Sequence, residues 1–111
     1  MIKVRLYSAG ADDICEILES GLTNQKNVEE WIMEQFPTIQ FDCMDFPYDL
    51  VCCYDCYFKS ERENQDANEL YHLLKHRLKG MEGVLFSVFL VDKQLNDIVE
   101  IEPGGVWKRS K

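Results

Sequence analysis

The run Val84–Val91 constrains the fold of this chain most, because all of its residues except Ser87 are apolar. When both sets of alternating side chains in a strand are apolar, the strand is expected inside a sheet, buried on both faces. Such a strand needs a neighbour on each side and a covering layer of helices. The chain has 111 residues, of which 46% are hydrophobic. That amount of apolar material provides one core, so we expect a single domain over residues 1–111.

Four other segments have the composition of strands. Apolar and polar residues alternate at residues 2–7 and again at residues 39–44, which predicts two strands with one buried face each. The segment Leu50–Phe58 is rich in aromatic residues, cysteine and valine, and it predicts a third strand that can form a hairpin with the second. The segment Ile98–Glu102 predicts a last strand with acidic residues.

Three helices are expected from apolar side chains at helical spacing and from the residues that flank them. Asp12 or Asp13 can cap the first helix, and Asn27, which stands three residues before a glutamate, can cap the second. The third helix follows the polar segment 60–66 and ends near Gly80.

This order of elements predicts an α+β fold. The pattern βαββαβ is that of ferredoxin-like sandwiches, here with one extra C-terminal strand, a mainly antiparallel sheet and helices on one face. A thioredoxin-like layout is the alternative, with Leu50–Phe58 as a loop or as part of the next helix. A thioredoxin-like redox site would need a second cysteine three residues after Cys15, where Leu18 stands. We expect residues 104–111 to form a frayed tail.

Charge is distributed unevenly along the chain. Twenty acidic and twelve basic residues give a net charge of −8. Residues 6–58 hold eleven of the acids and a single base, Lys26, so the net charge of that segment is −10. The shortage of lysine and arginine argues against direct binding to nucleic acid or to an anionic membrane, because phosphate contacts need those side chains. No apolar stretch is long enough to span a bilayer and the N-terminus lacks a signal-peptide core, so we expect a cytoplasmic protein.

The cysteines predict free thiols. Their number, five, is odd, and no secretory signal is visible, which favours a reducing compartment. The candidate ligands for a metal or thiol-redox site are Cys43, Cys52, Cys53 and Cys56. A strand would point Cys53 and Cys56 to opposite faces, so we favour core packing for these residues. His72 and His76 share a helix face, as zinc ligands can, but neighbouring lysine and arginine residues oppose a cation, so we expect a solvated helix flank.

The sequence contains no arrangement of side chains that specifies a reaction. Asp12–Asp13 and Glu29–Glu30 are paired carboxylates, but they stand at helix starts, where the helix dipole favours acids without any catalytic role. Neither a glycine-rich phosphate loop nor a Ser, His and Asp arrangement stands out. We therefore expect no catalytic residue and no cofactor, as in a protein that is not an enzyme.

Two functions from different classes remain open. The first is a small interaction protein that docks its acidic half on the basic surface of a protein partner, such as the nucleic-acid channel of an enzyme. Inhibitors carried by phages or other mobile elements, such as DNA mimics and anti-CRISPR proteins, have a similar composition. The second is a cysteine-based metal-binding or thiol-redox protein. The expected partner-binding residues are Asp12, Asp13, Glu16, Glu19, Glu29, Glu30, Glu34, Asp42, Asp45, Asp49 and Trp107. The last of these could also support a homodimer.

Overall fold

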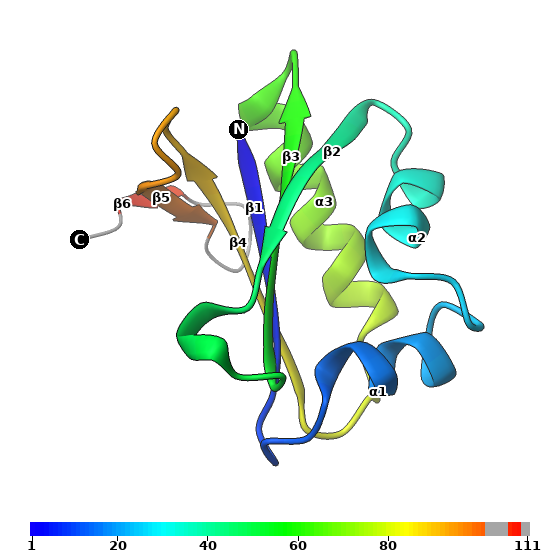
Figure 1. Cartoon of the computed structure of the whole chain (residues 1–111). Coiled ribbons are helices and arrows are strands. Elements are labelled where there is room, and N and C mark those ends of the chain that lie inside the picture. Colours follow the sequence, from blue (N-terminus) through cyan, green and yellow to red (C-terminus); the bar gives the residue numbers. More distant parts are fainter. Residues whose placement is uncertain (102–106, 110–111) are drawn as a thin grey trace.

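The described strands form one six-stranded sheet in the order β2-β3-β1-β4-β5-β6, and every neighbouring pair is antiparallel. The computed structural model describes the backbone of residues 1–101 and 107–109 and the side chains of residues 1–101 (Figure 1). In chain order the elements are β1 (Ile2–Ser8), α1 (Ile14–Gly21), α2 (Val28–Gln35), β2 (Ile39–Asp45), the 3-10 turn η1 (Pro47–Asp49), β3 (Cys53–Ser60), α3 (Glu63–Arg77), β4 (Val84–Val91), β5 (Asp97–Ile101) and β6 (Trp107–Arg109). The predicted α+β fold with an antiparallel sheet is confirmed.

The three helices lie on one side of the sheet (Figure 1). The main core fills the layer between them and the sheet. Its largest fully buried apolar side chains are Ile2, Val4, Leu6, Ile14, Leu18, Ile32, Phe58, Leu70, Leu74 and Val88. No helix in the described part of the chain is long and apolar enough to cross a membrane.

Side-chain caps fix the starts of the two short helices. The Asp13 carboxylate accepts a hydrogen bond from the backbone N–H of Glu16 at 3.2 Å, so Asp13 caps α1. The Asn27 side chain accepts from the backbone N–H of Glu30 at 3.1 Å and caps α2, as predicted. Helix α3 ends at Arg77, and Gly80 follows with a φ of +88°, a conformation that glycine adopts without strain.

Strand β3 begins at Cys53, three residues later than predicted. Tyr48 and Asp49 interrupt the extended chain because their φ angles, 64° and 55°, lie in the left-handed region. The predicted start at Leu50 is therefore wrong, since this residue lies outside β3 and its side chain is exposed. The strand prediction for the later part of the segment is confirmed, and residues 54, 56 and 58 all face the core. The thioredoxin-like alternative placed this segment in a loop or a helix, and that placement is wrong.

Strand β4 lies inside the sheet, but only its second half is buried as predicted. It pairs with β1 along its whole length, whereas β5 pairs with it only at Phe89–Val91. Val88, Phe89 and Val91 are buried, and Leu85 near the start of the strand is 45% exposed. Burial of the entire run on both faces was therefore a wrong expectation. Helices cover only one face of the sheet, and no described strand flanks the first half of β4 on its outer side.

The sheet face turned away from the helices carries charged side chains around a small second core. Tyr57, Phe89 and Val91 are buried there. The buried Lys3 reaches Asp97, with 2.6 Å between Nζ and Oδ1, and its ammonium lies 4.3 Å from the centre of the Phe89 ring. An opposite charge and an aromatic face together offset the cost of removing the Lys3 ammonium from water.

Candidate functional site

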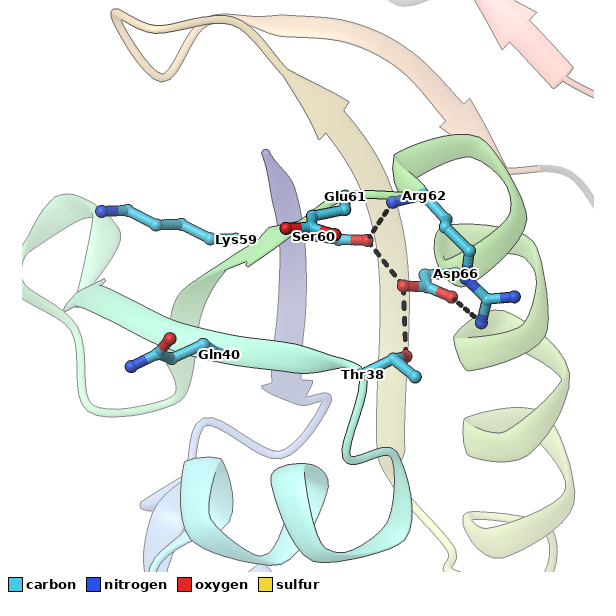
Figure 2. Close-up of a pocket in the computed structure, with 7 residues that line it drawn as sticks. All are labelled: Thr38, Gln40, Lys59, Ser60, Glu61, Arg62 and Asp66. Atoms are coloured by element: carbon cyan, nitrogen blue, oxygen red, sulfur yellow. Dashed lines mark hydrogen bonds and ion pairs between the residues drawn. The ribbon is translucent and has the colours of Figure 1, made fainter.

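A polar hollow lies where β2 begins, β3 ends and α3 begins (Figure 2). Its volume is about 580 Å³. The residues that line it are Thr38, Gln40, Lys59, Ser60, Glu61, Arg62 and Asp66. All of them are polar or charged, and such side chains are the ones that a catalytic or binding site uses.

Asp66 is the fully buried centre of this hollow, and its carboxylate is already engaged. It accepts hydrogen bonds from the Ser60 hydroxyl at 2.6 Å, from the Thr38 hydroxyl at 3.2 Å and from the Arg62 guanidinium at 2.9 Å. Figure 2 shows these three donors around Asp66, while Gln40 and Lys59 point away from the cluster. Through these three donors, the Asp66 carboxylate holds the start of α3 against the ends of β2 and β3. The hydrogen bonds of this carboxylate are therefore made within the chain.

Sequence reasoning did not single out Asp66. The polar segment 60–66 indicates only that a helix follows, and an acidic residue in the first turn of a helix is common. The available signal was the spacing of Ser60 and Asp66 across a helix start, which permits one side chain to bond the other. That signal is weak, since the third partner, Thr38, is 28 residues away.

Asp12 and Asp13, just before α1, lie on one surface with Glu16 and Glu19 of the helix. Asp12 and Glu16 are exposed, and neither forms an ion pair with a described residue. Asp13 and Glu19 are half-buried, and Asp13 is occupied as the helix cap. These acids line two neighbouring shallow hollows with Ser20. The start of α1 therefore carries two exposed acids, Asp12 and Glu16, that no described basic side chain pairs with.

The three acids of α2 each form a hydrogen bond or an ion pair with another residue of the chain. Glu29 is half-buried and accepts a hydrogen bond from the Tyr54 hydroxyl on β3. Glu30 accepts from the Asn27 side-chain amide at 3.0 Å, and Glu34 is paired with Lys26 at 2.5 Å. Burial raises the pKa of Tyr54, and the hydrogen bond to Glu29 raises it further. These internal contacts leave the α2 acids less available to a partner than the acids of α1.

The connection between β2 and β3 combines exposed apolar side chains with acids. Tyr48 is 83% exposed, and Met44, Leu50 and Val51 are exposed as well. Asp45 and Asp49 stand among them, both exposed and without an ion pair to any described residue. We call these six residues the hairpin patch. The third acid of the hairpin, Asp42, lies 3.4 Å from Lys59.

The hairpin patch is held in an unusual backbone conformation. Tyr48 and Asp49 are consecutive residues other than glycine with positive φ, 64° and 55°. Each such residue costs roughly 1 kcal/mol or more, and this kind of strain gathers at functional sites. Backbone hydrogen bonds from Asp49 N–H to the Phe46 carbonyl at 3.0 Å and from Leu50 N–H to the Pro47 carbonyl at 3.4 Å close the turn. The result is a turn that presents the Tyr48 side chain to solvent.

One backbone hydrogen bond joins the hairpin patch to the start of α1, and a second joins the residue after the patch to the end of β1. The N–H of Ile14 donates to the Val51 carbonyl at 3.0 Å, and the N–H of Ser8 donates to the Cys52 carbonyl at 2.8 Å. Asp12 and Asp13 therefore lie at the same end of the sheet as the hairpin patch, at the lower end in Figure 1. The start of α1 and the hairpin patch are therefore neighbours, and Glu29 of α2 lies close enough to α1 for its charge to act on Cys15.

All five cysteines are free, as predicted. Cys56 is buried and its thiol lies 3.7 Å from the Val4 carbonyl, whereas the other four are only half-buried, so the expectation that most would be buried was wrong. Burial and then the charge of Asp13 raise the pKa of Cys15 to about 12. Burial also raises the pKa of Cys43, Cys53 and Cys56. These thiols stay protonated at neutral pH, the form that is a poor nucleophile.

The remaining candidate residues have separate surroundings. Residues 1–101 contain no group of three or more histidine, cysteine or acidic side chains that could hold a metal ion. His72 and His76 are exposed on α3, as expected for a solvated flank. Trp107 begins β6, opposite Ile101, and its side chain lies outside the described residues. Of the predicted tail at 104–111, only 107–109 is described, and this part pairs with β5.

Comparisons with protein-family models, curated proteins and solved structures found no match to this chain.

Proposed function

We propose that this chain is a small non-enzymatic interaction protein, built as a ferredoxin-like sandwich, that docks its acidic end on a basic surface of a protein partner. The ferredoxin-like assignment is supported by the strand order β2-β3-β1-β4, by antiparallel pairing throughout and by helical connections from β1 to β2 and from β3 to β4. Strands β5 and β6 are then two extra C-terminal strands, one more than the sequence predicted.

The hairpin patch is the observation that carries the proposal. Exposed aromatic and aliphatic side chains provide the apolar area that a protein interface buries, and an exposed tyrosine is a common energetic centre of such interfaces. Asp45 and Asp49 provide charge that no described residue of the chain neutralises.

The proposed partner has lysine and arginine side chains around an apolar recess. Acidic side chains of the hairpin and of α1 would meet the basic rim, and Tyr48 would enter the recess. A nucleic-acid channel of an enzyme has such a rim, which is the surface that DNA-mimic and anti-CRISPR inhibitors occupy. Long-range attraction between the opposite charges would speed association, and salt would weaken it.

A comparative capture experiment tests this proposal. The parent chain is immobilised beside a hairpin variant (Asp42→Asn, Asp45→Asn, Asp49→Asn) and an α2 variant (Glu30→Gln, Glu34→Gln). Each is exposed to an extract of the organism that encodes the chain, and proteins are eluted in salt steps and quantified by mass spectrometry. We expect a basic protein that the parent and the α2 variant retain and the hairpin variant loses. A retained set that is the same for all three chains would contradict the proposal.

A further inference from the structure

A second surface differs in charge from the acidic end of the chain. An open groove of about 400 Å³ lies between the end of α3 and the start of β4, lined by Lys75, Leu78, Lys79, Val84, Leu85 and Phe86. Four of these side chains are apolar, and the other two are cationic. Neither lysine forms an ion pair with a described residue. In a chain with a net charge of −8, the groove is a local basic surface with an apolar floor.

One wall of the groove is an unpaired edge of the sheet. Strand β4 pairs with β1 along its whole length, but β5 pairs with it only at Phe89–Val91. No described strand therefore pairs with the outer edge of β4 along residues 84–87. The groove follows this edge, and the end of α3 forms the other wall, at the lower end of the sheet in Figure 1. A free strand edge beside a helix can receive an extended peptide as an added strand.

The hydrogen bonds of β4 show which backbone groups are free at this edge. The N–H of Ala9 in the β1 connection donates to the Gly83 carbonyl at 2.8 Å. At the other end of the strand, the N–H of Val91 donates to the Met1 carbonyl at 2.9 Å. The odd-numbered residues of β4 therefore face β1. Because alternate residues turn their backbone groups to opposite edges, the N–H and the carbonyl of Phe86 face outwards, and neither has a partner among the described residues.

The side chains around the edge specify the chemistry of the added strand. Phe86 packs against the main core on the helix side of the sheet, whereas Leu85 alternates to the other side and is 45% exposed. Ligand side chains on the helix side would meet α3, where Lys75 and Lys79 lie one helical turn apart. Carboxylates fit there, with their aliphatic stems against Leu78. Ligand side chains on the other side would lie beside Leu85, so apolar ones fit.

We propose that this groove binds an extended acidic segment of a protein partner, which adds to the sheet as a strand antiparallel to β4. The Phe86 N–H donates to a carbonyl of the segment, and the Phe86 carbonyl accepts from the N–H of the same ligand residue. Acidic side chains on one face of the segment pair with Lys75 and Lys79, and apolar side chains on its other face cover Leu85. This surface is separate from the hairpin patch, so the inference does not rest on docking of the acidic end.

Titration of the full chain with a synthetic peptide, followed by NMR, tests the proposal. The probe is a capped peptide in which glutamate and valine alternate, and the control peptide has lysine in place of every glutamate. We expect the glutamate peptide to bind and to slow hydrogen exchange of the Phe86 amide by about tenfold or more, because the added strand shields this N–H from water. The Leu85 amide faces β1 and should change little. The lysine peptide should not bind, because it brings like charges to the groove.

N-methylated peptides test the added strand itself. The glutamates lie on the helix side opposite Phe86, so their backbone N–H groups face β4, while those of the valines point away from it. Methylation of the glutamate nitrogens should therefore abolish binding, and methylation of the valine nitrogens should be tolerated. Loss of binding with the valine-methylated peptide, or binding by the glutamate-methylated one, would contradict the proposed pairing.

Charge-reversal variants locate the contact. The groove variant (Lys75→Glu, Lys79→Glu) is compared with a control that has the same charge change at two exposed lysines outside the groove (Lys59→Glu, Lys93→Glu). Circular dichroism establishes that both are folded. The groove variant should bind the glutamate peptide at least about tenfold more weakly than the control does. Absence of binding to the parent, equal binding by the two variants, or a Phe86 amide already protected in the free chain would each overturn the proposal. Protection in the free chain would mean that another segment or a second copy covers this edge.

Discussion

Arg5 on β1 stands directly opposite Asp55 on β3, and its Nε and Nη2 atoms each donate to one Asp55 carboxylate oxygen at 2.8 Å. Asp55 is only 2% exposed, so its charge depends on this partner. The hydrogen bond to Asp55 is the main cause that raises the pKa of Arg5. A register slip of one residue would move Arg5 to the other sheet face, so the pair favours the observed register between strands that are 50 residues apart.

Replacing Asp55 with asparagine should destabilise the fold strongly. The substitution keeps the size of the side chain but removes the charge that Arg5 needs, and breaking a buried pair typically costs about 3–5 kcal/mol. Because Arg5 is partly exposed, we expect the lower end of that range. Urea denaturation followed by circular dichroism measures the change. The exposed pair of Lys59 and Asp42 is the control, and Asp42→Asn should cost less than about 1 kcal/mol. Equal losses for the two variants would contradict a structural role of the Arg5–Asp55 pair.

Asp66→Ala should be among the most damaging substitutions of an acidic residue. It leaves the Thr38 and Ser60 hydroxyls and the Arg62 guanidinium without their shared acceptor, and we expect a loss of about 3 kcal/mol in the free energy of unfolding. Glu61→Gln in the same hollow is the matched control, because Glu61 is exposed, and it should change stability by less than about 0.5 kcal/mol. A tolerated Asp66→Ala would show that Asp66 does not fasten α3 to the sheet.

Stability should fall as the pH rises from about 9 towards 12. The folded chain keeps the Cys15 proton up to a pKa of about 12, whereas the unfolded chain releases it near the ordinary value of 9.0. Between those values the unfolded state binds fewer protons, so the free energy of unfolding decreases with pH. Cys15→Ala should make this decrease shallower when urea midpoints are measured at several pH values, and Ser20→Ala should leave it unchanged. An unchanged slope for Cys15→Ala would refute the contribution of Cys15.

Cys56 should resist a thiol reagent in the native state. Its side chain is fully buried and burial raises its pKa, so reaction requires opening of the structure. The half-buried Cys52 and Cys53 are better exposed and should react sooner. Mass spectrometry of peptides after timed labelling measures each site, and urea should bring Cys56 to the rate of the others. Rapid native labelling of Cys56 would contradict its place in the core.

Local patterns in the sequence predicted much of the fold. The cap at Asn27 depends on residues three apart, and the alternation in β1 depends on neighbours, so both are visible in a short window of sequence. The apolar run Val84–Val91 predicted an interior strand correctly. The partial exposure of this strand was not predictable, because it depends on where β5 pairs with β4. That pairing is confined to Phe89–Val91 and contains a bulge between Leu90 and Val91.

The candidate site was harder to predict from the sequence, because it depends on contacts over long separations. Acids were grouped by position along the chain, yet Glu29 bonds Tyr54, 25 residues away, and only the tertiary structure shows this. The hairpin patch could not be predicted from the sequence, because Leu50 fits the pattern of a strand. The left-handed conformation of Tyr48 and Asp49 delays the start of the strand, and a tyrosine does not signal that conformation as glycine would.

Surface plasmon resonance with the captured basic protein tests docking through the acidic hairpin most directly. The parent, the hairpin variant (Asp42→Asn, Asp45→Asn, Asp49→Asn), the α2 variant (Glu30→Gln, Glu34→Gln) and Tyr48→Ala are compared at several salt concentrations. We expect the hairpin variant to associate about tenfold more slowly at low salt, with a weaker dependence on salt, while the α2 variant behaves as the parent does. Tyr48→Ala should mainly speed dissociation, by about tenfold or more. Binding that ignores salt, and that neither the hairpin variant nor Tyr48→Ala changes, would contradict the account.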